Sequence, residues 1–199
     1  AERVGLTSLY ASALRNAFIS GTGILYTYWN GDIKTGLYAD RESRIPINGD
    51  ISCEVLSVEN VYFGDPHISD IQQQPYIIIA SCRETEAVLR EARRHGADIS
   101  ELRAIEDDSD DGKVTVFTKL FKEYKAGGGY TIKSVKVTEN ATVRKEFGTG
   151  LSLYPLAVFS WEKRGGLAYG ESEITYLIPN QIAINRMITA SVWSAMTTG

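Results

Sequence analysis

The sequence predicts an α+β fold with mixed or antiparallel β-strands, a few helices and a closing helix interrupted by a proline. Three observations predict this class. Apolar and polar residues alternate over several short segments separated by turn residues, a pattern typical of antiparallel strands. Apolar residues recur at helical spacing near both ends of the chain. Hydrophobic residues make up 43% and charged residues 23% of the 199 positions, which suits a globular chain and excludes a mainly disordered one.

The first helix is expected from Val4 to Ile19, where apolar residues share one face until Gly21-Thr22-Gly23 ends the pattern. A strand rich in aromatic and β-branched residues follows over 24–29. Asn30-Gly31-Asp32 is a hairpin turn signal, so residues 33–38 are expected to form the returning strand. The next expected elements are a polar, arginine-bearing loop over 40–48, strands over 51–55, 60–63 and 75–80, and a helix over 84–95.

The clearest hairpin joins Lys113 to Lys125 with Tyr130 to Thr138 through three glycines, because apolar residues alternate on both sides of this turn. Further strands are expected over 141–147 and 154–162. The final segment, over 171–196, places its apolar residues on a helical stripe. Pro179 interrupts this stripe, which predicts a kink or a short helix that hands over to a longer one.

One acidic segment accounts for the acidity of the chain. The formal net charge of −4 comes from 21 Lys and Arg against 25 Asp and Glu, and five of the acidic residues lie between Glu106 and Asp111. The other positions carry 20 acidic against 21 basic residues, so the body is close to neutral. The order Asp107, Ser109, Asp111 matches the start of a calcium loop. Because Thr118 stands where such a loop places its bidentate glutamate, a solvated loop is the favoured alternative.

The sequence offers no constellation typical of an enzyme, and we expect no cofactor or metal. It lacks a nucleophile elbow, a phosphate-binding glycine loop and a complete dinucleotide fingerprint. Asp65, His67 and Asp70 form a minimal metal or acid-base cluster, although aspartates beside a proline commonly build turns. Cys53 and Cys82 are too few for a cysteine-based zinc site. Reduced thiols are the default, and their context does not show whether they pair.

No apolar run approaches the roughly 18 residues that cross a bilayer, and the chain opens without a signal-peptide pattern, so no membrane association is expected. The acidic balance and the scattered basic residues oppose tight DNA binding. The chain begins with Ala1-Glu2-Arg3 and ends directly after a helical pattern. These two ends are the kind that we expect in a piece cut from a longer protein.

Two polar residues interrupt the apolar stripe of the closing helix. Gln181 and Asn185 are four residues apart, where a simple core helix would carry leucine or isoleucine. Either they lie at the edge of the stripe and meet solvent, or they hydrogen-bond a neighbouring helix or subunit and fix its register. Arg186 is the one charge from Ile174 to Met196, which predicts a partner surface on this helix. The packing candidates are therefore Gln181, Asn185 and Arg186.

Several segments carry a family resemblance through their order along the chain. The strongest are Tyr154-Pro155 and Tyr169-Gly170-Glu171-Ser172-Glu173, with Ile178-Pro179-Asn180-Gln181 and Ile184-Asn185. The others are Gly21-Thr22-Gly23 with the strand to Trp29-Asn30, Gly49-Asp50-Ile51 with Glu54-Val55, Val58-Glu59-Asn60-Val61-Tyr62-Phe63 with Asp65-Pro66, and Tyr76-Ile77-Ile78. In this order the chain resembles the portal proteins of tailed double-stranded DNA bacteriophages over nearly its whole length.

The resemblance implies a structural protein of the virion, not an enzyme. Portal subunits form a homo-oligomeric ring, typically a dodecamer, at one capsid vertex. A separate terminase motor pumps double-stranded DNA through the ring without sequence specificity, and the tail attaches beneath it. The implied partners are further copies of the chain, capsid proteins and the terminase. The implied locations are the virion and, during assembly, the host cytoplasm.

The same resemblance implies a division of the chain. Residues 1–165 correspond to an α+β wing-like domain, and residues 171–199 to a helix leading toward the stem of the ring. The rest of the stem, the clip and any crown are not evident in the sequence. Two alternatives stay open: another virion adaptor or tail protein, and a metal-dependent hydrolase that uses Asp65, His67 and Asp70.

Overall fold

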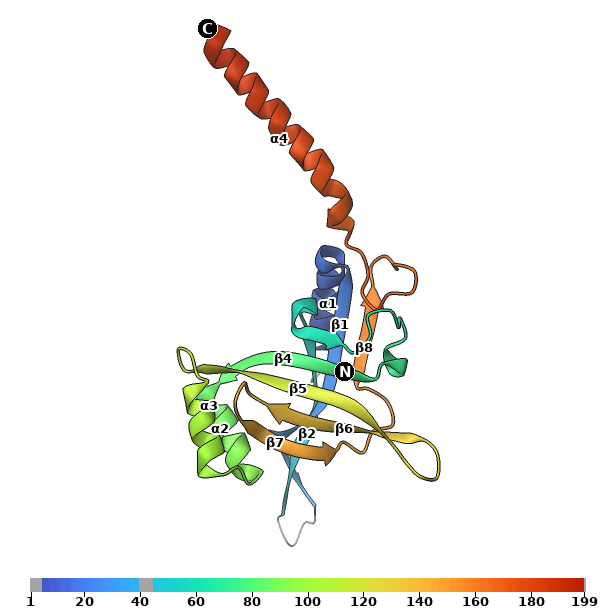
Figure 1. Ribbon diagram of the computed structural model, residues 1–199, viewed down its shortest axis with the longest axis vertical. Helices are drawn as coiled ribbons and strands as arrows, with labels where there is room; N and C mark the ends of the chain where they lie inside the picture. The colour runs from blue at the N-terminus through green and yellow to red at the C-terminus, as the bar shows by residue number, and fades with distance from the viewer. Residues whose placement is uncertain (1–4, 40–44, 199) are drawn as a thin grey trace.

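The computed structural model describes residues 5–39 and 45–198 and confirms the α+β class. The described residues form two antiparallel sheets and four α-helices, with 39% of residues in strands and 35% in helices. One sheet has three strands in the order β2-β1-β8, and the other has five in the order β3-β4-β5-β6-β7. Figure 1 shows both sheets in one body, from which a long helix projects at one end and a β-ribbon at the other.

The five-stranded sheet is an antiparallel meander around the predicted hairpin. That hairpin is confirmed, because β5 and β6 pair from Phe117 with Val137 to Tyr124 with Tyr130. The expected strands on both sides of it are confirmed as well. The five strands are β3 (Val61–Phe63), β4 (Tyr76–Glu84), β5 (Lys113–Tyr124), β6 (Tyr130–Val137) and β7 (Thr142–Gly148).

The three-stranded sheet corrects one sequence-based expectation. It consists of β1 (Thr22–Tyr38), β2 (Pro46–Leu56) and β8 (Leu156–Ser160). The hairpin turn expected at Asn30-Gly31-Asp32 is wrong, since β1 runs through it and pairs with β2 on both sides, with register shifts between Asn30 and Leu37. Pairing with β2, the next strand along the chain, therefore overrides the local Asn-Gly turn preference. Residues 40–44 of the expected arginine-bearing loop lie outside the described residues.

Three helices pack on the body. The first two confirm the expected ones: α1 (Leu6–Ser20) ends at Gly21 in the left-handed conformation, and α2 (Thr85–Arg94) ends at His95. The third, α3 (Ile99–Asp107), is not predicted. It begins with a capping box, in which the Glu101 carboxylate accepts the Asp98 N–H at 3.0 Å. Single-turn 3₁₀ helices cover Val58–Asn60 and Ile71–Gln73.

Two clusters of buried apolar residues lie on one face of the five-stranded sheet. On β5, the alternating residues Val114, Val116 and Leu120 all point to this face. At one end of the sheet α2 and α3 pack on it, and the buried side chains include Val88, Leu89 and Ile105. At the other end the three-stranded sheet covers it, and the core consists of Ile24, Val61, Phe63, Ile71, Ile77, Ile79, Leu120, Ile132, Tyr154, Leu156 and Ala168.

The closing helix α4 (Glu173–Thr198) has 26 residues and projects away from both sheets (Figure 1). The expected division into a short and a longer helix is wrong, because α4 is continuous with Pro179 inside it. Proline removes one amide donor and thereby frees the carbonyl group of Thr175 four residues earlier. Thr175 is exposed, so water can bind this carbonyl group and the helix continues.

Candidate assembly interface

The root of α4 is a close contact between two glycine backbones from distant parts of the chain. A β-carbon placed on Gly21 would lie 2.5 Å from the carbonyl oxygen of Gly170, and one placed on Gly170 would meet the carbonyl oxygen of Gly21. Gly21 also has a φ of +85°, which ends α1. Only glycine at both positions allows the end of α1 and the start of the α4 segment to approach this closely.

Side-chain hydrogen bonds surround this contact. The Gly170 N–H donates to Thr22 Oγ1 at 2.9 Å, and Ser172 Oγ donates to the Phe18 carbonyl oxygen at 2.9 Å. Thr22 and Ser172 are both buried. Two segments far apart in the sequence, one beginning at Gly21 and one containing Gly170, therefore meet at the root of α4.

Trp161 closes the root from the side of β8. Its backbone N–H donates to the Gly21 carbonyl oxygen at 2.9 Å, and its indole Nε1 donates to Glu173 Oε2 at 3.1 Å. Its ring meets Phe18 edge to face, with centroids 5.2 Å apart. Trp161 thus binds Glu173, the first residue of α4, while Ser172 just before it binds Phe18, and together these contacts fix the direction in which the helix leaves.

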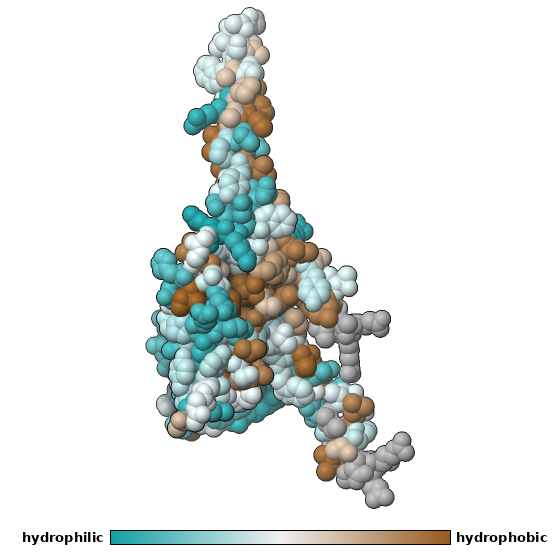
Figure 2. All heavy atoms as spheres, turned by 90° about the vertical axis from the view of Figure 1, so that its right-hand side faces the viewer, coloured by the Kyte–Doolittle hydropathy of each residue, from teal (hydrophilic) through white to brown (hydrophobic). Residues whose placement is uncertain are grey.

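Beyond this root, α4 lies open to solvent. None of its residues, all of which are described, is buried. Ten large apolar side chains are at least 46% exposed: Tyr176, Leu177, Ile178, Ile182, Ile184, Met187, Ile188, Val192, Trp193 and Met196. Figure 2 shows brown apolar side chains along the projecting arm. Because a helix this apolar is normally covered, α4 is the candidate assembly interface.

The packing candidates lie together on α4. Gln181 Nε2 donates to Asn185 Oδ1 at 2.9 Å, and both side chains are exposed. Arg186 follows directly and lines a shallow groove on the helix with Ile182 and Trp193. The structure therefore brings the two amides into contact within one helix. Their contact with a neighbouring subunit stays a prediction.

A second exposed apolar surface lies on the ribbon formed by β1 and β2. Trp29 pairs with Ile51 across the ribbon, and both are more than half exposed. The Trp29 ring lies over Gly49, where an added β-carbon would come within 2.5 Å of it. Sequence reasoning missed this surface because it placed a turn directly after Trp29. The unbroken run of strand-forming residues before that turn is the signal that favours a longer strand.

The acidic segment is not simply the expected solvated loop. Glu106 and Asp107 belong to the last turn of α3. Asp108 accepts hydrogen bonds from the backbone N–H and the side-chain amide of Asn140, at 3.0 and 2.6 Å. Burial raises the pKa of Asp108, but hydrogen bonds from Thr138 and Asn140 outweigh it and lower this pKa overall. The segment therefore ties α3 to the loop before β7.

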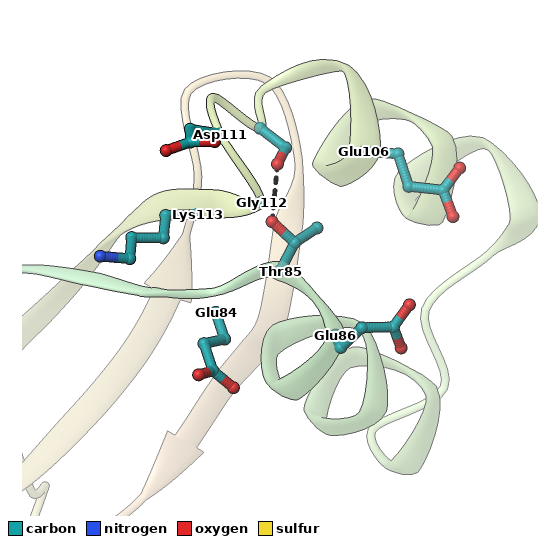
Figure 3. Close-up of a pocket in the computed structure, with 8 residues that line it drawn as sticks. Glu84, Thr85, Glu86, Glu106, Asp111, Gly112 and Lys113 are labelled. Carbon is teal, nitrogen blue, oxygen red and sulfur yellow. Dashed lines mark hydrogen bonds between the residues drawn. The ribbon is translucent and has the colours of Figure 1, made fainter.

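A hollow beside this segment gathers four carboxylates, which do not converge. Figure 3 shows Glu84, Glu86, Glu106 and Asp111 around it, with their side chains spread in different directions. Thr85 Oγ1 and Ser109 Oγ, 2.6 Å apart, join its two walls. In the described part of the chain, no three His, Cys, Asp or Glu side chains are arranged to hold a metal ion. The calcium-loop alternative gains no support from this geometry.

Asp65 and Asp70 each cap a local turn. Asp65 Oδ1 accepts the backbone N–H of His67 at 2.8 Å, and Asp70 Oδ1 accepts that of Gln72 at 2.9 Å. The structure thus joins Asp65 to the backbone of His67 and not to its imidazole. These are the contacts of turn-building aspartates.

Sequence reasoning missed a charge network that joins α2 to the sheet. Glu91 binds Arg83 Nη1 at 2.6 Å and Lys136 Nζ at 2.5 Å. Burial raises the pKa of Glu91, but the charges and hydrogen bonds of Lys136 and Arg83 outweigh it and hold this pKa below its usual value. No pattern in the sequence near Glu91 indicates its ion pair with Lys136, because Lys136 lies on β6 and Arg83 on β4.

Both cysteines are free thiols on different sheets. Cys53 lies on β2 and is half-buried, and Cys82 lies on β4 and is exposed. Thr27 Oγ1 lies 3.7 Å from Cys53 Sγ.

Comparison of the sequence with models of known protein families, and with curated proteins, finds no match. Among the described residues, none of the helices has the length and apolarity needed to cross a membrane.

Proposed function

We propose that this chain is a structural subunit of a homo-oligomeric ring, the portal or head–tail connector of a tailed double-stranded DNA bacteriophage. The observation that carries the proposal is α4, a 26-residue helix that is rooted firmly in the body and has no buried residue of its own. Such a helix needs neighbours to cover it, and further copies of the same chain supply them in a ring.

The root of α4 supports the portal proposal in particular. The motifs that carry the resemblance are far apart in sequence, and they meet through Gly21, Thr22 and Gly170. In the proposal, residues 1–165 form the wing-like domain and residues 171–199 lead toward the stem. Capsid proteins and the terminase are the further partners of the assembled ring.

Charge agrees with a passive conduit for DNA. Outside the acidic segment the chain is close to neutral. On α4 one cation, Arg186, lies between Ile174 and Thr198. A channel that neutralised many phosphates would hold DNA tightly and slow its passage. The proposed ring therefore conducts DNA without gripping it.

Native mass spectrometry and electron microscopy of the purified chain test this proposal. We expect a closed ring, and Ile182→Ser together with Trp193→Ser should weaken self-association at least tenfold by removing apolar contacts. Ile99→Ser, which alters an even more exposed apolar residue of α3, is the matched control and should leave the ring intact.

A chain that stays monomeric at high concentration would contradict the proposal. A ring or tube whose subunit number differs from that of a portal would favour another virion adaptor or tail protein. A divalent cation that binds and raises the melting temperature would favour the hydrolase alternative.

A further inference from the structure

The stripe of apolar residues on α4 has a polar centre. At about 100° per residue, Gln181 and Asn185 lie roughly 20° on either side of the line through Ile174 and Val192. One flank of the stripe consists of Leu177, Ile184 and Ile188, and the other of Ile178, Ile182 and Trp193. The two amides therefore face whatever covers the middle of this helix.

The hydrogen bond between the two amides leaves one donor group and one acceptor unused. Gln181 Nε2 donates to Asn185 Oδ1. Asn185 Nδ2 and Gln181 Oε1 have no hydrogen-bond partner among the described residues. If both amides turned over, Gln181 Nε2 and Asn185 Oδ1 would be the free groups instead. In either orientation, the pair offers a donor from one residue and an acceptor from the other.

The exposed apolar area of α4 is large and is spread around the helix, so covering it takes more than one neighbouring copy. Ten large apolar side chains, each at least 46% exposed, present on the order of 1,000 Å². A stable interface needs roughly 800 Å² from each partner. A purely apolar partner of this size would bury the free donor and acceptor without hydrogen bonds, which is unfavourable. The occupant must therefore offer an acceptor and a donor at this place, which a second copy of this chain does through its own two amides.

A second copy of this chain carries those amides at the matching height. Each α4 leaves its body from the same root at Gly170, so helices around a ring run parallel and in register. In the proposed ring each α4 has one neighbour on either side, so the donor of one copy can meet the acceptor of the next. A head-to-tail contact of this kind repeats in one direction and closes into a ring when its rotation closes.

We infer that the free amide N–H of Asn185 in each subunit donates to Gln181 Oε1 of the neighbouring subunit, forming a closed belt of amide hydrogen bonds around the ring. This inference rests on the proposed function and adds the device that fixes its register. Buried polar residues in helical seams are known to select register and subunit number at some cost in stability. The belt selects one subunit number, and the apolar flanks supply most of the affinity.

Native mass spectrometry of three forms of the chain tests the belt. The unsubstituted chain is expected to give one subunit number. Asn185→Leu should still assemble, because it extends the apolar stripe, but into a mixture of subunit numbers. Asn180→Leu makes the same chemical change on the same helix, away from the stripe, and should keep the single number. Gln181→Leu and the double substitution should resemble Asn185→Leu, because either change breaks the same hydrogen bond.

The outcomes separate the belt from the proposed function. A ring with the same single subunit number in Asn185→Leu and Gln181→Leu overturns the belt and leaves the ring proposal standing. A monomeric unsubstituted chain overturns both. Since α4 contributes no buried residue, the far-UV circular dichroism spectrum should be the same in all variants, which checks that each one folds.

Discussion

Gly21 and Gly170 lie backbone against backbone, so closely that neither position has room for a β-carbon. One residue ends α1 and the other precedes α4, so this contact determines where the exposed helix leaves the body. It is held by Thr22, whose hydroxyl accepts the Gly170 N–H.

The first prediction concerns this contact. Gly170→Ala should lower the free energy of unfolding by about 2 kcal/mol, because the new methyl group meets backbone atoms that cannot move aside. Urea denaturation measures the change. Gly148→Ala is the matched control: its β-carbon would meet no atom within 4 Å, so it should leave stability unchanged or slightly raised.

The second prediction concerns the acid stability that Glu91 confers. Its pKa is lower in the folded than in the unfolded chain. Glu91 therefore stabilises the fold at pH values above its unfolded pKa of about 4.3, and this stabilisation is lost as the pH falls through the folded pKa. Glu91→Gln should cost roughly 2 kcal/mol near neutral pH and should flatten the decline of stability below pH 5.

Denaturation curves at a series of pH values measure this effect. Glu86→Gln makes the same change at an exposed position of the same helix and is the control at neutral pH, where it should alter stability by less than about 0.5 kcal/mol. Equal profiles for Glu91→Gln and the unsubstituted chain would show that the network does not operate in solution.

The third prediction concerns the phenol of Tyr154. Burial, followed by the neighbouring Tyr124 and Tyr130, raises its pKa from 10.0 to about 12. Because the pKa of Tyr154 is higher in the folded than in the unfolded chain, the protonated phenol contributes stability to the fold. This contribution is complete below pH 10 and is lost as the pH rises from 10 toward 12. In an alkaline absorbance titration, Tyr154→Phe should show one tyrosine fewer than the unsubstituted chain, and the missing tyrosine should be one that titrates late. Loss of its hydrogen bond to the carbonyl oxygens of Gln74 or Pro75 should cost about 1 kcal/mol.

The fourth prediction concerns the capping box of α3. Asp98→Ala should destabilise the protein by about 1 kcal/mol, since it removes the side chain at the N-cap. Asp98→Ser, which keeps an oxygen at that position, should recover most of the loss in thermal unfolding. If the alanine and serine variants melt together, the cap does not contribute.

Local patterns in the sequence account for most of the fold. The alternation around the three glycines predicts the pairing of β5 and β6, and the helical spacing predicts α1 and α2. The turn at Asn30-Gly31-Asp32 is wrong because β2 pairs across it, and a local pattern does not contain that contact. The helix α3 was within reach of sequence reasoning, because Asp98 and Glu101 have the spacing of a capping box.

Part of the candidate interface can likewise be predicted from the sequence, and part depends on the fold. The apolar character of α4 and the adjacency of Gln181 and Asn185 follow from spacing along one helix. The contact of Gly21 with Gly170 depends on how the chain folds back on itself, so no window of sequence contains it. The same holds for Glu91 and Lys136, which come from a helix and a distant strand.

The root of α4 also bears on the entropy of association. A helix joined by a loose linker would sample many directions, and binding a partner would have to suppress them. The interlocked glycines and the hydrogen bonds of Thr22, Ser172 and Trp161 remove that freedom during folding. Each subunit thus meets its neighbour pre-organised, and the free energy of the helix contacts is not spent on aligning the helix.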